Sequence, residues 1–471
     1  MKERRNRDGH KTWAVWLSII AILIIGAGIF FYYAFLRQSQ AELIEAVPND
    51  VVFLYEINDH DGFVKSSKNI QPYLNELFVM DGFNAYESMY HKLSNSNLPS
   101  TISGHYTESG MALLFNTRID KATFRKLLRS LSIDPANYTA FEQFKIYTYG
   151  ANFKSLKFVY FNHILSISDN VELLKSAVTQ HKYPKNLLAD KGFKSLYEIA
   201  EKNKKQNWIF LNNPVYYDFL ETFFNSDVAL AMGKIKDYSK WSAYQIRFSH
   251  NDVFLSGYVT PDSPKFDEIS KRHTDRKTPE SVMPFHTQWY YKAEMAKHTA
   301  YQFALANDSA KSYRYLIIEQ DSLNRRFNLF KNNTQAELLR NNFPNGIYPA
   351  ADSLNKPELS SFDKGFYQYI LEKDGYFIFA PSQESIDLYF KDINTNGTIT
   401  DNRYYQLANS NMASENLLEY AYFNNDNQES IQKNLSEKGK NALWGKHLKV
   451  FTISFNNLAE GFATVNIYAG F

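Results

Sequence analysis

The longest apolar stretch of the chain covers residues 13–36, WAVWLSIIAILIIGAGIFFYYAFL, and contains no charged residue. An α-helix of this length, at about 1.5 Å per residue, can cross a hydrocarbon layer of about 30 Å with some tilt. Trp13 and Trp16 lie at one end, and aromatic residues cluster over 30–35 at the other, as in the aromatic belts at membrane interfaces. We therefore expect a transmembrane helix at residues 13–36.

The charges beside this stretch predict its orientation. Residues 1–12 contain five lysines and arginines against two acids, a local charge of +3. The positive-inside rule then places residues 1–12 in the cytoplasm and the bulk of the chain in the periplasm. A cleaved signal peptide is the main alternative, but its apolar region would be shorter, about 7–15 residues, and Tyr32–Arg37 offers no small-x-small cleavage site. Since no second apolar run approaches the length of a span, we expect a single-pass protein of the inner membrane.

After a linker at residues 37–46, short apolar and polar alternations typical of β-strands follow, and their order occurs twice. A proline turn leads into an aromatic strand near residue 47 and again near residue 282. Residues 244–249 and 451–456 both alternate with period two, which predicts strands with one buried and one wet face. We interpret the chain as an internal repeat, with a first copy at 47–262, a linker at 263–281 and a second copy at 282–471.

The middle of each copy predicts a β-hairpin that leads into a helix. The first hairpin joins residues 157–161 to 164–168, and the second joins 366–371 to 376–380 through Asp374-Gly375, a strong turn signal. Asp169 with Glu172 has the form of a capping box, and Ser382 is placed to cap the second helix. These patterns predict an α+β fold: an N-terminal transmembrane helix followed by two related lobes of mostly antiparallel β-sheet with packed helices.

Composition and charge narrow the function classes. The chain has 471 residues, a net charge of +2 and no cysteine. Disulfides, thiolate metal sites and cysteine nucleophiles are therefore excluded. Without residues 1–12 the net charge is −1, so we expect the exported part to lack a basic face for nucleic acid or for anionic lipid headgroups. We expect no nucleic-acid partner.

Several segments resemble a family of uncharacterised, single-pass, membrane-anchored bacterial envelope proteins classed as a domain of unknown function. They are Ala46–Asp50, Tyr55–Asn58, Gly62-Phe63, Ile164–Glu172 and Trp208–Asn213. The resemblance implies a periplasmic domain in a Gram-negative bacterium. It implies no catalytic residues, because the family has none assigned.

The sequence offers little catalytic chemistry. It contains no H-E-x-x-H, G-x-S-x-G, phosphate-loop or dinucleotide motif, and no two histidines have the i,i+4 spacing of a helical zinc site. Asp392–Ile399 resembles the start of a calcium loop, but Arg403 stands where a bidentate glutamate belongs, so an Asn/Gly turn is the preferred interpretation of residues 392–403. We therefore assign no catalytic, cofactor-binding or metal-binding residue.

These observations favour a non-enzymatic, membrane-anchored periplasmic protein that acts as a binding or interaction module in the cell envelope. Its partners would be the membrane, through residues 13–36, and another envelope protein, a lipid or a glycan. Two alternatives stay open. One is a lipid or precursor shuttle with an apolar cavity lined by the many aromatic side chains. The other is an envelope hydrolase whose site is assembled from distant Asp, Glu, His and Ser residues.

Overall fold

The structure is a computed structural model, and it places a defined part of the chain. The residues it describes are 42–59, 62, 92–93, 98–108, 110–151, 154–182, 186–203, 206–249, 251–262, 264, 266, 279–295, 298–306, 311–319, 347–349, 367–410, 417–424, 435–441, 447–457 and 462–471.

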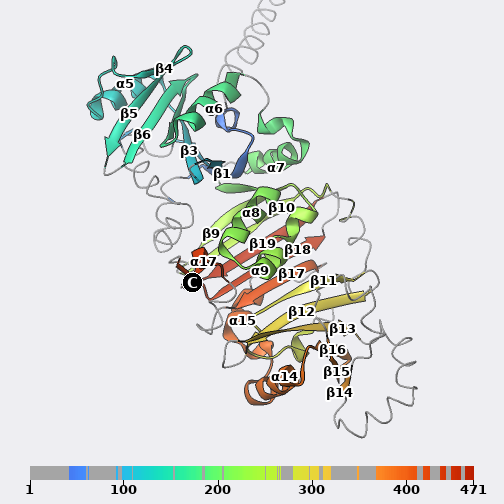
Figure 1. Cartoon of the computed structure of the whole chain (residues 1–471). Coiled ribbons are helices and arrows are strands. Elements are labelled where there is room, and N and C mark those ends of the chain that lie inside the picture. The colour runs from blue at the N-terminus through green and yellow to red at the C-terminus, as the bar shows by residue number, and fades with distance from the viewer. Residues whose placement is uncertain are drawn as a thin grey trace, which may run out of the picture.

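The described residues form a 19-stranded antiparallel β-sheet (Figure 1). Its strands in chain order are β1 Val51–Ile57, β2 Ser100–Thr107, β3 Gly110–Arg118, β4 Thr139–Phe141, β5 Phe144–Ala151, β6 Lys154–Phe161, β7 Ile164–Ser168, β8 Trp208–Asn212, β9 Trp241–Phe248, β10 Asp252–Val259, β11 Trp289–Met295, β12 His298–Ala306, β13 Ser312–Glu319, β14 Ile347–Pro349, β15 Tyr369–Lys373, β16 Tyr376–Ala380, β17 Leu417–Asn424, β18 Val450–Asn457 and β19 Ala463–Gly470.

The pairings run without a break from one end of the sheet to the other. Their order in space is β4-β5-β6-β7-β3-β2-β1-β8-β9-β10-β19-β18-β17-β11-β12-β13-β16-β15-β14. The centre of this order is the β10–β19 pair, which extends from Asp252 opposite Gly470 to Val259 opposite Ala463. Outward from this centre, the strands of the first half follow the order β10-β9-β8-β1-β2-β3-β7-β6-β5. Those of the second half follow the matching order β19-β18-β17-β11-β12-β13-β16-β15-β14.

The expected fold class is therefore wrong in its architecture. The sequence predicted two separate α+β lobes, but β10 and β19, the last strand of each proposed copy, join edge to edge and make one continuous sheet. Pairing these strands satisfies two rows of backbone groups that would otherwise be open edges. Within the described ranges no helix is long and apolar enough to cross a membrane. The expected span at residues 13–36 lies outside those ranges.

Short helices pack on both faces of the sheet. They are η2 Leu43–Ala46, α5 Lys121–Ser130, α6 Val171–Lys182, η3 Leu187–Ala189, α7 Lys191–Lys202, α8 Asn213–Phe223, α9 Ser226–Met232, η4 Lys234–Asp237, η5 Pro279–Val282, α14 Gln383–Asn396, η7 Ile399–Asp401, α15 Arg403–Ser410 and α17 Glu437–Asn441.

The alternation of side chains along the strands separates these helices into two sets. Ile209 and Leu211 of β8 join the core under α5 and η4, whereas Trp208 and Phe210 of the same strand join the core under α7. By the same alternation, α5, α8 and α9 lie on a first face, and α6, α7, α14 and α15 lie on the second. Helix α8 contacts β1 and β8 of its own half, and α8 and α9 also share a core with Trp289 of β11 and Phe423 of β17, in the other half of the sheet.

Local sequence signals explain both hairpins and both following helices. Asn162 and His163 have φ values of 41° and 66°, and Asp374 and Gly375 have 49° and 84°, as a tight two-residue turn requires. Both predicted hairpins are thus confirmed as β6–β7 and β15–β16. Ser382 caps α14, as predicted.

The cap of α6 differs from the expectation. The side chain of Asn170, not that of Asp169, accepts hydrogen bonds from the backbone N–H groups of Glu172 and Leu173, at 2.9 and 3.1 Å. The helix therefore begins one residue later than a cap at Asp169 requires, at Val171.

The polar side of β18 is not wet, contrary to the period-two interpretation. Thr452 and Ser454 are fully buried. Helix α15 packs against β18. Thr452 pairs with Tyr422 of β17 on one side and with Tyr468 of β19 on the other. Alternation correctly predicted the strand here, but the second face carries its own layer of helices.

Candidate functional site

Three side chains near the start of the folded body form an Asp–His–Ser relay. Ser103 and His105 are two residues apart on β2, so both point to the same face of the sheet. The pairing of β1 with β2 places Val51 opposite His105 and so brings Asp50 beside the imidazole. The His105 Nδ1 atom lies 2.9 Å from Asp50 Oδ1, and Nε2 lies 2.8 Å from Ser103 Oγ.

The atoms of the relay have the order that acyl-transfer enzymes use, but a substrate cannot reach the Ser103 hydroxyl. The hydrogen bond with His105 holds the pKa of Asp50 below its usual value, against the opposing effect of desolvation. A carboxylate on Nδ1 and a hydroxyl at Nε2 are the arrangement of a Ser–His–Asp triad. However, the side chains of Ser103 and His105 have no exposed surface, so a substrate carbonyl cannot approach the hydroxyl in this state. In this conformation the relay fastens the turn before β1 to β2.

A second histidine–carboxylate pair occupies the corresponding turn of the second half. His286 follows Pro284 by two residues, as Asp50 follows Pro48. Its Nδ1 lies 2.6 Å from Asp392 Oδ1, and its backbone N–H donates to Asp392 Oδ2 at 2.9 Å. Burial raises the pKa of Asp392, but the hydrogen bonds from His286 and Asn396 outweigh it, so the pKa is lowered. Here the carboxylate is buried and the imidazole is half-exposed.

The calcium-loop resemblance at residues 392–403 fails on geometry. Asp392, Asn394 and Asn396 would be the first three ligands, but all three lie in α14, where alternate residues point in different directions around the helix. Asp392 and Asn396 bond to each other at 2.8 Å, and Asp392 also holds His286. Gly397, with φ of 89°, ends the helix, as the preferred turn interpretation expects. No cluster of three or more acidic or histidine side chains within the described ranges could hold a metal ion.

The segment between the expected span and the sheet is a strap, residues 42–50, held down by two histidines. Its helix η2 packs against α6, β2, β3 and β7, and Ala46 and Val47 are fully buried. His181 of α6 lies 3.3 Å from Glu45, and His105 holds Asp50. Glu45 and Asp50 of the strap thus each pair with a histidine of the body.

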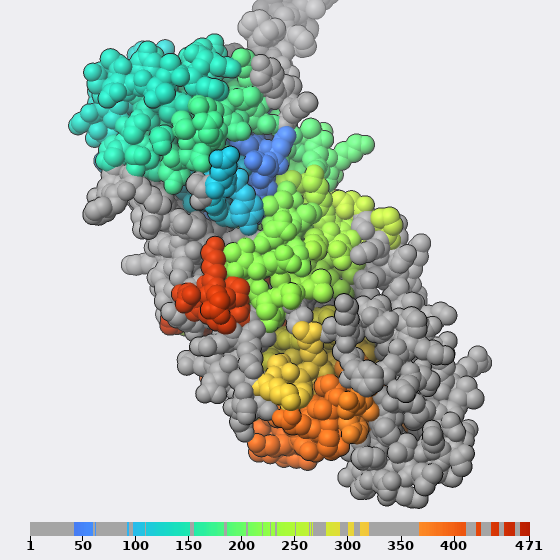
Figure 2. Space-filling view, in the orientation of Figure 1, coloured from blue at the N-terminus to red at the C-terminus, as the bar shows by residue number. Residues whose placement is uncertain are grey.

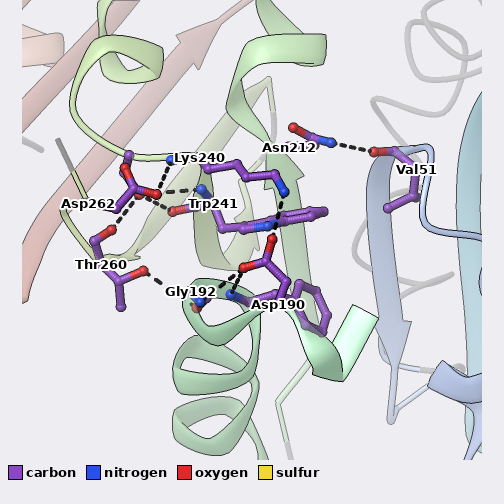
Figure 3. Close-up of polar contacts among 10 residues, drawn as sticks. Val51, Asp190, Gly192, Asn212, Lys240, Trp241, Thr260 and Asp262 are labelled. Carbon is purple, nitrogen blue, oxygen red and sulfur yellow. Dashed lines mark hydrogen bonds and ion pairs between the residues drawn. The ribbon is translucent and has the colours of Figure 1, made fainter. Parts of the chain in front are cut away.

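A third polar cluster ties α7 to the central strands (Figure 3). The side chain of Asp190 caps α7 by accepting hydrogen bonds from the N–H groups of Gly192 and Phe193. It also forms an ion pair with Lys240 Nζ, at 2.6 Å. Burial raises the pKa of Asp190, but these bonds lower it below its usual value. Nearby, Asn212 Nδ2 donates to the carbonyl of Val51 at 3.2 Å. All of these groups are occupied in holding helix and strand ends, which is a structural role.

The outer face of α5 is strongly basic, contrary to the expectation of no basic face. Phe124, Leu127 and Leu128 are buried against the sheet. The exposed cationic residues of the helix are Lys121, Arg125, Lys126 and Arg129. The near-zero net charge of the exported part concealed this local excess, because the balancing acids lie elsewhere.

Sequence reasoning missed both the relay and the basic helix. The i,i+4 spacing of a helical histidine pair does not detect Ser103 and His105, which have the i,i+2 spacing of one strand face. The cations at 121, 125 and 129 recur every four residues, which is the helical period of one exposed face. Reading local periodicity of charge, rather than net charge, would have found that face.

No family model matches this chain, and no curated protein matches it. One similar solved structure is described as "Structure of crystal form I of TP0453". It aligns with 79% of this chain and 98% of its own chain, at 8% identity and a TM-score of 0.22. A TM-score at this level supports no statement about fold or function.

Proposed function

We propose that this chain is a membrane-anchored extracytoplasmic protein without catalytic activity, which presents a long sheet-based body to a partner in the cell envelope. The observation that supports it is the uncharged stretch of residues 13–36, followed within six residues by a strap that is packed onto the sheet. A short connection of this kind keeps the folded body close to the bilayer. The partner belongs to one of three classes: an envelope protein, a lipid or a glycan.

The roles of the polar clusters support a binding protein over an enzyme. Ser103 and His105 of the relay are buried, the His286–Asp392 pair holds a turn to α14, and Asp190 caps α7. An active site needs a polar group that can reach its substrate. In each cluster the carboxylate is engaged with protein groups.

Topology can be measured directly because the chain contains no cysteine. We would introduce single cysteines at Asn409, exposed on α15, and at Arg7, before the expected span. A membrane-impermeant maleimide added to intact spheroplasts should label Asn409→Cys and should label Arg7→Cys only after lysis. The reverse pattern would refute the proposal. Photo-crosslinking from native membranes then tests for a partner, and reproducible absence of any protein, lipid or glycan adduct would count against a binding role.

A hydrolase is the second candidate, and the relay geometry is the observation that favours it. If the strap opens, Ser103 would become a nucleophile with His105 as its base. A fluorophosphonate probe would then label the wild type but not Ser103→Ala. We expect no Ser103-dependent labelling, because the hydroxyl is sealed. Labelling that disappears in Ser103→Ala would favour the hydrolase and overturn the non-enzymatic proposal.

A further inference from the structure

The exposed basic face of α5 has no ion-pair partner among the described residues. Around an ideal helix at about 100° per residue, Lys121, Arg125 and Arg129 fall within about 80° of one another, and Lys126 stands about 60° further round. The only acid near them on the helix is its N-cap, Asp120, which accepts a hydrogen bond from Thr123 N–H at 2.6 Å. We name Lys121, Arg125, Lys126 and Arg129 the α5 basic face.

An exposed aromatic side chain, Tyr138, lies in the segment that follows α5. Tyr138 is 41% exposed, and Lys145 Nζ lies 4.1 Å from the centre of its ring. The Tyr138 ring is 6.2 Å from that of Tyr147, which is 5.9 Å from the Phe124 ring beneath α5. Tyrosine and lysine together are typical of surfaces that lie at the headgroup level of a bilayer.

The balance of charge over this region is positive. Residues 118–145 contain six lysines and arginines against three acids, Asp120, Asp134 and Glu142. Glu142 is already paired, because Lys182 Nζ lies 3.0 Å from it. The region carries +3 and therefore differs from the rest of the exported part, whose net charge is −4.

The strap brings this end of the sheet close to the expected membrane. Residues 37–41 separate the predicted span from Glu42, and five residues reach at most about 18 Å. Helix η2 packs on β3 and β7, and β7 is followed in the sheet by β6 and β5, which lie under α5. Measured along the sheet at about 4.8 Å per strand, β3 and β5 are about 14 Å apart, with η2 on the second face of the sheet and α5 on the first. Figures 1 and 2 show this end of the molecule opposite the end that carries α14.

We propose that the α5 basic face docks on the anionic phospholipid headgroups of the bilayer in which the chain is anchored. The proposal rests on the proposed anchoring and specifies which surface the body turns toward the membrane. Each lysine or arginine held close to an anionic membrane strengthens such a contact about fivefold. Docking at α5 would orient the sheet and leave the half that carries α14 and α15 available to the envelope partner.

The test uses the full chain in proteoliposomes, with a single donor-labelled cysteine and an acceptor on the lipid headgroups. Ala122→Cys places the donor on the exposed side of α5, and Asn409→Cys places it on α15. Energy transfer from position 122 should rise when phosphatidylglycerol replaces part of the phosphatidylcholine and should fall in 0.5 M salt, because the contact is screened. Transfer from position 409 should change little.

Charge reversal separates the α5 face from general electrostatics. Arg125→Glu combined with Arg129→Glu should weaken the contact of α5 with the anionic headgroups at least about 25-fold. Energy transfer from position 122 should then return to the value measured in phosphatidylcholine alone. The matched control, Lys391→Glu with Arg403→Glu, reverses two exposed charges on α14 and α15 and should leave it unchanged. Equal transfer in both lipids, or equal effects of the two reversals, would overturn the proposal.

Two further measurements identify what has failed. Flotation with vesicles after carbonate extraction reports the membrane anchor alone. A chain that does not float refutes the proposed function. A chain that floats but shows no contact of α5 with the lipid refutes only the docking. Binding of a fluorescent oligonucleotide that depends on Arg125 and Arg129, without any lipid dependence, would assign the face to nucleic acid and overturn the docking.

Discussion

Gly257 lies in β10, the strand that joins the two halves of the sheet, and its replacement by alanine tests that junction. A Cβ atom at this position would lie 1.8 Å from the carbonyl oxygen of Ala243 and 2.7 Å from the Cα of Tyr244. Both atoms belong to the backbone of β9, so no side-chain rotation relieves the overlap. The strand would have to move by roughly 1 Å, in a close-packed interior that resists such shifts.

The magnitude follows from two opposing effects. Alanine in a strand is ordinarily favoured over glycine by about 0.5–1 kcal/mol, because glycine loses more conformational entropy on folding. Overpacking typically costs about 1–3 kcal/mol, and a clash with main chain belongs at the upper end of that range. We therefore expect Gly257→Ala to lower the free energy of unfolding by about 2 kcal/mol.

Gly150→Ala is the matched control. Gly150 is also a strand glycine, in β5, and a Cβ there meets no atom within 4 Å. The same substitution should be neutral or stabilising by up to about 1 kcal/mol. Urea unfolding of the full chain in detergent, followed by tryptophan fluorescence, compares the midpoints. If Gly257→Ala unfolded at the wild-type midpoint, or if both variants were equally destabilised, the close approach of β9 and β10 would be refuted.

Three smaller changes test other features. Asn170→Ala should destabilise α6 by about 1 kcal/mol, because the Asn170 side chain caps the helix, whereas Asp169→Ala should have little effect. The same unfolding assay measures both variants. The opposite ranking would make Asp169 the cap. Because the pKa of Asp392 is lowered in the folded state, its contribution to stability is present above the unfolded value of about 3.9 and is lost as pH falls through the folded value. The wild type should therefore lose more stability than Asp392→Asn between about pH 5 and pH 3, and Asp387→Asn, an exposed position of the same helix, should keep the wild-type slope. Gly439→Ala should separate α17 from α8, since its Cβ would lie 2.1 Å from the Phe223 carbonyl oxygen; unchanged hydrogen exchange at that crossing would contradict the packing.

Local signals predicted local structure well. Asp374-Gly375 predicted a turn that needs positive φ at two residues, and Ser382 predicted a helix start because its hydroxyl can accept a backbone N–H. The alternation in residues 451–456 predicted β18. In each of these cases the cause lies within a few residues of its effect.

The architecture was not predictable in the same way. Whether β10 and β19 pair with each other or remain edges depends on strands more than 200 residues apart, and period-two alternation says nothing about the neighbour of a strand. The buried hydroxyls of Thr452 and Ser454 show the same limit, because α15 covers a face that the alternation assigns to water. The relay was missed for a related reason, since Asp50 reaches His105 only through the β1–β2 register.

The register at the centre of the sheet bears on the internal repeat, which stays a prediction. Ser256 pairs with Asn466, and the neighbouring positions of β10 and β19 pair outward from them in both directions. If β10 and β19 are corresponding strands offset by 210 residues, Ser256 is paired with its own counterpart, as a two-fold axis through that point requires. The same axis explains why α6 and α7 share a face with α14 and α15, because a two-fold perpendicular to the sheet preserves faces. Such symmetry would leave the two halves free to diverge on their surfaces. The exposed cations of α5, in the half that carries the strap, are the kind of difference that would let one half face the bilayer and the other a partner.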